Sequence, residues 1–486
     1  MQNSKLIALL KTLHSRELAK FEEYVWSPYF NKHEQVRTLC SYLVKQASNW
    51  EHPRNFLKEK VFKHIYPAKK KFDGSQINRL ASQLLQLLHD FLVSEQLHSP
   101  QKALEHKLLL LEELRKRKSD KDYNSVLQQY YRAEENLRQE TPDAYYYLYR
   151  LHKELDTLFI EKGGRQFDRN LQLKNNYFDI FFVVEKLRLA CDMTNRNIIV
   201  RSDYEVSMLD YLWGYAEHPE IAKIPSVRIY KAIYLMRNSD NPEDEQRYRE
   251  LKKLLEEHLG IFHQGELMDI YSYILNHCAK KINEGHSNYY REMLSAYQFL
   301  VNNKIIFVDG YLPAWDYKNT VTVALRVQEY EWAASFIEEY QKYLTPDNRD
   351  NVYRYNLASY HYAVMDHGKA LQALHDVDFT DASYYIGAKT IQLKIYYELN
   401  EAEALESLIE AFSTYLRRNK DISDYWKQSN LNTLKLTRRI NKLRIQQDYL
   451  RDKRFKEILE KLTLEVNEVT PLANKDWLLY CLEKMK

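Results

Sequence analysis

Glycine and proline are scarce in this sequence. There are 10 glycines and 11 prolines among 486 residues, so glycine makes up about 2% of the chain against a usual ~7%. β-Hairpins and phosphate-binding loops depend on glycine for positive φ angles and close backbone approaches. A chain with so little glycine suits neither, and most of its glycines lie where helices should end, as at Gly163, Gly164 and Gly368. We therefore predict an all-α fold.

Cysteine is also rare, and the four cysteines lie far apart. Cys40, Cys191, Cys278 and Cys481 form no CxxC pair. This spacing argues against a disulfide framework and against a zinc site, and it favours reduced thiols in a cytoplasmic protein.

Long apolar runs are missing as well. The runs at 6–10 and 180–184 are only five residues each. The first is too short for a signal peptide and the second is far below membrane-spanning length. We therefore expect a cytoplasmic protein with no membrane partner.

The sequence contains no familiar catalytic motif. Neither GxGxxG, GxxxxGK, GxSxG nor HExxH occurs in it. His258 and His263 are five residues apart, which puts them on different faces of a helix, whereas a metal site needs three or four convergent ligands. The 16 histidines are scattered. We expect no catalytic residues, no metal and no cofactor, and hence a protein that is not an enzyme.

Charge excess of one sign is absent, but tyrosine is abundant. The 71 basic and 68 acidic residues leave a formal charge of +3, which creates no global field that would recruit nucleic acid.

The 40 tyrosines have two interpretations. They form an adhesive binding surface, or they replace Phe and Leu at half-buried positions between helices.

The chain repeats itself near its C-terminal end. Residues 369–377 align with 403–411, and Ala370 aligns with Ala404 at an offset of 404 minus 370, or 34 residues. An earlier copy at 330–337 places Ala333 37 residues before Ala370. Each unit predicts two antiparallel helices, and we expect Ala370 and Ala404 to occupy equivalent positions where the helices approach closely.

This period resembles that of the tetratricopeptide family over about residues 317–418. The resemblance implies an α-solenoid of helical hairpins, with the first helix of each hairpin lining a concave groove. That groove would present six side chains to a protein or peptide partner: Tyr355, Ser359, Tyr362, Lys389, Leu393 and Tyr396. The alternative is that these residues only pack on neighbouring helices.

A basic segment follows the repeats. Residues 417–456 contain thirteen basic and four acidic residues, a balance of +9. Lys435, Arg438, Arg439 and Lys442 share one helix face, which could contact phosphates. The alternative is a solvated face, or a face that docks on acidic helices of the same chain.

The whole chain also resembles a family of large bacterial helical proteins of uncharacterised function. The residues that carry this second resemblance are the segments 27–32 (SPYFNK) and 474–478 (NKDWL). It implies no particular activity.

We predict four regions: N-terminal helices at 1–100, solenoid-like helices at 101–310, tetratricopeptide-like repeats at 311–418 and basic helices at 419–486. The predicted function is that of a protein-interaction scaffold. The alternative is a nucleic-acid-binding protein that uses the basic C-terminal helices.

Overall fold

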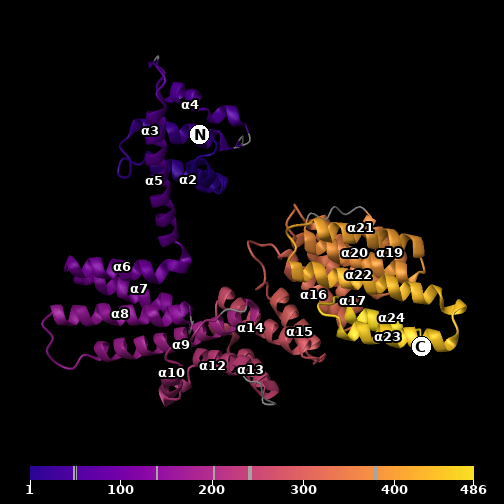
Figure 1. Ribbon diagram of the computed structural model, residues 1–486. Helices are drawn as coiled ribbons and strands as arrows, with labels where there is room; N and C mark the ends of the chain where they lie inside the picture. Colours follow the sequence, from indigo (N-terminus) through magenta and orange to yellow (C-terminus); the bar gives the residue numbers. More distant parts are fainter. Residues whose placement is uncertain are drawn as a thin grey trace. The chain divides into compact units, whose positions relative to one another are not determined.

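The computed structural model describes residues 1–47, 50, 52–69, 71–137, 141–200, 203–238, 244–375 and 381–485 (Figure 1). In these ranges the chain forms 24 α-helices and no strand, which confirms the all-α prediction. The helices are α1 (Lys5–Leu10), α2 (Ser15–Trp26), α3 (Glu34–Lys45), α4 (Lys58–Ile65), α5 (Gly74–Leu97), α6 (Ala103–Lys116), α7 (Asp120–Leu137), α8 (Pro142–Glu161), α9 (Arg169–Val200), α10 (Leu209–Ala216), α11 (Pro219–Ala222), α12 (Pro225–Asn238), α13 (Asp244–His258), α14 (Gln264–Asn283), α15 (Tyr289–Asn302), α16 (Ala314–Arg326), α17 (Tyr330–Tyr340), α18 (Arg349–Ala363), α19 (His367–His375), α20 (Ala382–Glu398), α21 (Ala402–Arg418), α22 (Asp424–Ile445), α23 (Asp452–Glu468) and α24 (Lys475–Glu483).

The helices belong to two compact units. Unit 1 comprises Met1–Thr194 and Asp203–Phe262, and unit 2 comprises Asn195–Ser202 and His263–Lys486. Most contacts within them join helices that are neighbours in sequence, as in a series of hairpins. The finer division into four regions stays a prediction. None of the helices in the described part combines the length and hydropathy that a membrane crossing needs.

The N-terminal helices of unit 1 share one hydrophobic cluster. Asp73 caps α5 by accepting hydrogen bonds from the backbone N–H groups of Ser75 and Gln76. The apolar stripe of α5, which includes Ile77, Leu84 and Phe91, packs against residues of α1 to α4. That stripe therefore serves internal packing.

The last helices of unit 2 form a second cluster. Buried side chains of α20 to α24 pack together, from Ile386 in α20 to Trp477 in α24. The basic segment and the hairpin of α20 and α21 thus share one core.

Three hairpins of unit 2 close with the same turn. After the first helix, Gln328, Met365 and Asn400 adopt left-handed φ angles of 64°, 62° and 62°. The next N–H then reaches back to the carbonyl of the residue five positions earlier. These bonds are Glu329 to Ala324 (3.0 Å), Asp366 to His361 (2.8 Å) and Glu401 to Tyr396 (3.0 Å).

The positions of these turns give a different spacing between the last two repeats from the 34 residues predicted from the sequence. The left-handed residues are 37 and then 35 residues apart (365 minus 328, 400 minus 365). With this register Ala333 and Ala370 correspond to Leu405, and all three are buried. Ala404 is only half-buried. The prediction that Ala370 and Ala404 are equivalent is therefore wrong by one residue. Positions 376 and 377 of that alignment lie outside the described residues.

The same turn also occurs in unit 1, between α6 and α7. Lys118 has a φ of 59°, and the N–H of Ser119 donates to the carbonyl of Leu114 at 3.0 Å. Four residues after Ser119, Tyr123 is buried, as are the residues at the equivalent place in unit 2. Figure 1 shows these two helices side by side.

The left-handed turns are built without glycine, which makes them a target for stabilisation. A non-glycine residue in this region costs about 1–2 kcal/mol, and glycine loses about 0.5–1 kcal/mol through its larger unfolded-state entropy. We expect Met365→Gly to stabilise unit 2 by about 0.5–1 kcal/mol, which raises its thermal midpoint by roughly 1–4 °C in circular dichroism. Asn400→Gly is the matched control and should gain less, because asparagine tolerates this conformation. A lower midpoint for Met365→Gly would contradict the assignment.

Candidate interaction face of the C-terminal hairpins

The first helices of three consecutive hairpins lie next to one another. Helix α16 packs on α18, and α18 packs on α20. Their facing and exposed side chains recur at helical spacing, and we call this set the first-helix face. Its members are Trp315, Lys318, Thr322 and Arg326 of α16, Tyr355, Ser359 and Tyr362 of α18, and Ser383, Tyr384, Lys394 and Glu398 of α20.

At one end of this face, Lys318 is surrounded by aromatic rings. Its Nζ lies 5.1, 5.2 and 5.0 Å from the ring centroids of Trp315, Tyr355 and Tyr384. It donates a hydrogen bond to Ser383 Oγ at 3.1 Å. Burial lowers the pKa of Lys318, while the nearby Asp381 carboxylate acts to raise it. The three rings therefore stabilise a partly desolvated ammonium through cation–π contacts.

Tyr355 can take this position because the residue opposite it is glycine. A Cβ atom added to Gly387 of α20 would lie 2.5 Å from the Tyr355 hydroxyl oxygen and 2.8 Å from a ring carbon. Tyr355 also meets Tyr384 edge to face at 5.1 Å. The close contact between α18 and α20 thus depends on the missing side chain.

At the other end of the face, Glu398 joins four helices. Its Oε1 accepts hydrogen bonds from Tyr362 Oη at 2.8 Å and from Trp477 Nε1 at 3.1 Å. Its Oε2 lies 3.1 Å from His367 Nε2. These partners come from α18, α24 and α19, so a single carboxylate anchors the C-terminal helix to two hairpins.

Lys394 lies beside this carboxylate network without a carboxylate of its own. Its Nζ is 5.9 Å from the Tyr362 ring and 5.7 Å from the Trp477 ring. No ion pair within 4 Å involves it in the described part of the chain. Burial, and after it the positive charge of Arg326, lowers the pKa of Lys394 to about 8.

The six residues predicted for a groove lie in three different settings. Tyr355, Ser359 and Tyr362 belong to the first-helix face, although Tyr355 is buried. Leu393 is 1% exposed and belongs to the core of unit 2.

Lys389 and Tyr396 lie on another stripe of α20. Lys389 Nζ donates to Gln392 Oε1 at 2.9 Å and lies over the ring of Tyr385, which stacks on Tyr415 of α21. The contacts of Lys389 thus lie along α20 and toward α21, and Tyr396 packs against the C-terminal cluster. No pattern in the sequence predicts a site role for Trp477, Lys394 or Glu398, although Trp477 lies within the segment 474–478.

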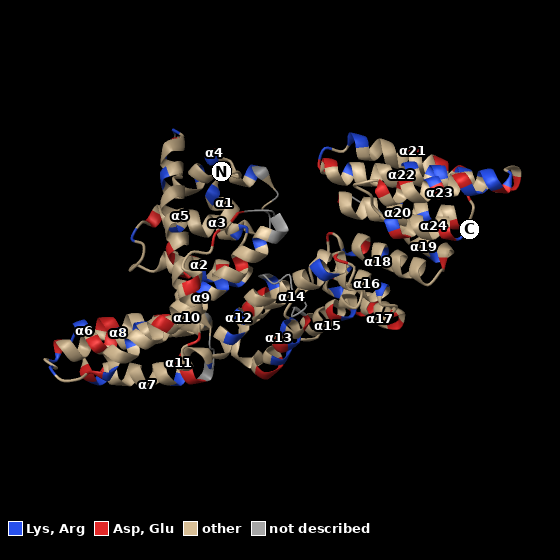
Figure 2. Ribbon diagram, turned by 60° about the horizontal axis from the view of Figure 1, so that its bottom comes forward, with Lys and Arg blue, Asp and Glu red and all other residues tan. Residues whose placement is uncertain are grey.

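Two of the four residues in the basic stripe are paired within the chain. Arg438 bonds the carboxylate of Glu406 in α21, and Arg439 bonds that of Glu465 in α23. Lys435 and Lys442 are exposed. Figure 2 shows acidic residues interspersed with the basic ones along α21 to α23. Part of the local charge excess is thus neutralised by neighbouring helices.

No metal or known relative identifies a chemistry for this face. Among the described residues no three His, Cys, Asp or Glu side chains converge closely enough to hold a metal ion. The chain matches no protein-family model, no curated protein and no solved structure.

The contact between Tyr355 and Gly387 predicts a position-specific cost. Gly387→Ala must displace Tyr355, and we expect a loss of about 1–3 kcal/mol in the free energy of unfolding, measured with urea. Gly214→Ala is the matched control: it lies in α10 with no neighbouring atom within 4 Å, so it should be neutral or stabilising by up to about 1 kcal/mol.

A double variant tests the cause of that cost. Tyr355→Ala removes the ring that the new methyl group would strike. Gly387→Ala should then cost nothing further in a Tyr355→Ala background. An undiminished cost in the double variant would contradict the contact.

The lowered pKa of Lys394 predicts a pH-dependent stability. Below pH 8 its ammonium is charged in both states, and burial of that charge destabilises the native chain. Between pH 8 and the ordinary value of 10.5, the native state releases its proton first, so stability rises with pH. The full difference in the free energy of unfolding is on the order of 3 kcal/mol.

The comparison variant is Lys394→Met. Urea midpoints measured from pH 7 to 9 should rise for the wild type relative to this variant, because other titrating groups affect both proteins equally. Lys435→Met, a change at an exposed lysine, should follow the wild-type profile. Parallel profiles for the wild type and Lys394→Met would refute the pKa assignment.

Proposed function

We propose that this protein is a non-enzymatic, tetratricopeptide-like scaffold that binds a protein or peptide partner on its first-helix face. The observation that carries the proposal is the arrangement of α16, α18 and α20, which brings aromatic and cationic side chains of three successive hairpins to one surface. Aromatic residues and arginine are enriched in protein interfaces.

The shared hairpin turn supports the repeat class. Its recurrence at intervals of 37 and 35 residues is near the 34-residue period of tetratricopeptide units. Repeats of this kind bury a continuous core by stacking and offer an extended surface along one side.

The Trp315 end of the face is the better candidate for the binding site. At the Glu398 end, Trp477 of α24 already contacts Lys394 and the Glu398 carboxylate. At the other end, the Trp315 side chain is 57% exposed, and Thr322 of α16 is also exposed. A partner segment bound there would bury an aromatic residue that the free chain leaves in water.

The test compares capture of partners by the wild-type chain and by variants. Trp315→Ala together with Ser359→Glu should reduce recovery of specific partners at least about tenfold, because it removes the exposed ring and puts a charge in the face. The thermal midpoint should change little. Tyr425→Ala is the matched control, since Tyr425 is 72% exposed and lies outside the face. Tyr362 is unsuitable because its hydroxyl anchors Glu398.

The same preparation separates this proposal from the nucleic-acid alternative. Partner capture that survives the double variant would refute the first-helix face. Filter binding with single-stranded RNA and duplex DNA at two salt concentrations tests Lys435 and Lys442. Binding that weakens steeply with salt, and that Lys435→Ala with Lys442→Ala abolishes, would favour the alternative.

A further inference from the structure

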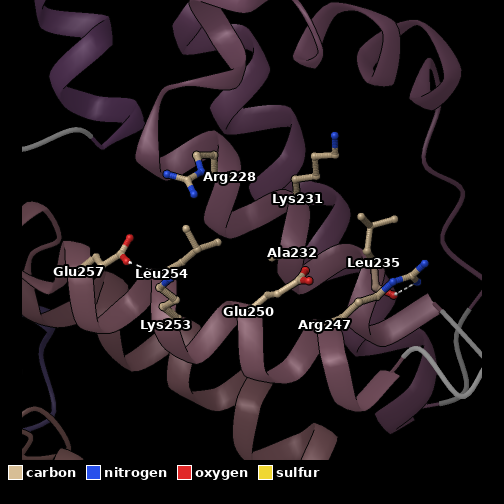
Figure 3. Close-up of a pocket in the computed structure, with 9 residues that line it drawn as sticks. All are labelled: Arg228, Lys231, Ala232, Leu235, Arg247, Glu250, Lys253, Leu254 and Glu257. Carbon is tan, nitrogen blue, oxygen red and sulfur yellow. Dashed lines mark hydrogen bonds and ion pairs between the residues drawn. The ribbon is translucent and has the colours of Figure 1, made fainter.

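The hairpin of α12 and α13 in unit 1 contains an open hollow of about 490 Å³ (Figure 3). Four lining residues of α12 recur at i, i+3, i+4 and i+7, which places them on one side of the helix. The other wall comes from α13. The lining residues are Arg228, Lys231, Ala232 and Leu235 of α12, and Arg247, Glu250, Lys253, Leu254 and Glu257 of α13.

The floor of this furrow is apolar. Ala232, Leu235 and Leu254 are half-buried between the two helices. The opposite side of α12, including Ile229 and Ile233, is fully buried in unit 1. The furrow therefore brings apolar side chains of the hairpin into contact with water.

The rim of the furrow is predominantly basic. Four Lys or Arg residues and two Glu residues line it, a balance of +2 (four minus two). Lys231 pairs with Glu217, and Glu257 lies 3.9 Å from Lys253. Arg228 is exposed at one side (Figure 3). An acidic ligand would find cations on both walls, from Arg228 on α12 to Lys253 on α13.

We propose that this furrow binds an amphipathic helix of a protein partner, with apolar residues on the floor and acidic residues against the basic rim. Helices commonly bind in apolar grooves through residues at i, i+3, i+4 and i+7. The site lies in unit 1 and is independent of the first-helix face.

The two glutamates favour such a helix over nucleic acid. Duplex DNA carries one negative charge per ~1.7 Å along its axis, so it cannot avoid Glu250 and Glu257 in the wall. A helix can place its acids only opposite the cations. The leucines on the floor also offer nothing specific to a phosphate backbone.

The test uses full-length protein and a fluorescein-labelled synthetic peptide. The peptide has about 20 residues, long enough to form a helix, with a leucine stripe flanked by glutamates. Fluorescence polarisation should show saturable binding that weakens several-fold between about 50 and 300 mM salt. A peptide with lysines in place of the glutamates should not bind. Arg228→Glu with Lys253→Glu should weaken binding at least tenfold.

Matched controls distinguish the furrow from general charge attraction. Arg249→Glu makes the same kind of charge change on α13 outside the furrow, and it should weaken peptide binding by less than about twofold. An equal loss for Arg249→Glu would overturn the proposal. So would equally tight binding of oligoglutamate without leucines, or preferential binding of duplex DNA. Each of these results would leave the proposal for the first-helix face intact.

Discussion

The closure of four hairpins through a left-handed residue, at Lys118, Gln328, Met365 and Asn400, is the constraint on which the packing of those hairpins depends. One residue at positive φ turns the chain, and the next N–H bonds the preceding helix, as at Met365 and Asp366. This geometry fixes which residue of the second helix faces inward. Tyr123, Ala333 and Ala370 are all buried four residues after the residue that closes the turn. In these hairpins the conformation of one residue thus sets the register between the two helices.

The sequence predicted the class of fold but not this register. Scarce glycine and proline correctly indicated helices throughout. The Ala–Leu pattern found the C-terminal hairpins but aligned Ala404 with Ala370, although Leu405 holds the equivalent buried position. The turn has no sequence signature here, because Gln328 and Met365 take a conformation usually given to glycine or asparagine. An alignment based on small side chains was therefore wrong by one residue, because the backbone conformation of the turn sets the register of the second helix.

The candidate site was predictable only within one helix. Tyr355, Ser359 and Tyr362 follow helical spacing, and they do lie along α18. To place Lys389 and Tyr396, the orientation of α20 about its own axis must be known. That orientation is set by packing on α21 and by the close approach of Tyr355 to Gly387. Trp477 reaches Glu398 across 79 residues of sequence. No local pattern in the sequence contains such a contact.

The cationic side chains of this chain differ in how much additional electrostatic attraction they can offer to an acidic ligand. Arg438 and Arg439 already bond carboxylates on neighbouring helices, so an external anion would have to compete with those partners. Among the residues that the structure describes, Lys394 has rings around it but no carboxylate within ion-pair distance, and Arg228 is exposed at the edge of an apolar furrow. An acidic group brought to Arg228 gains attraction while apolar surface is removed from water beside it. Local basic content is therefore a weaker guide to binding than the combination of an exposed cation with an apolar floor.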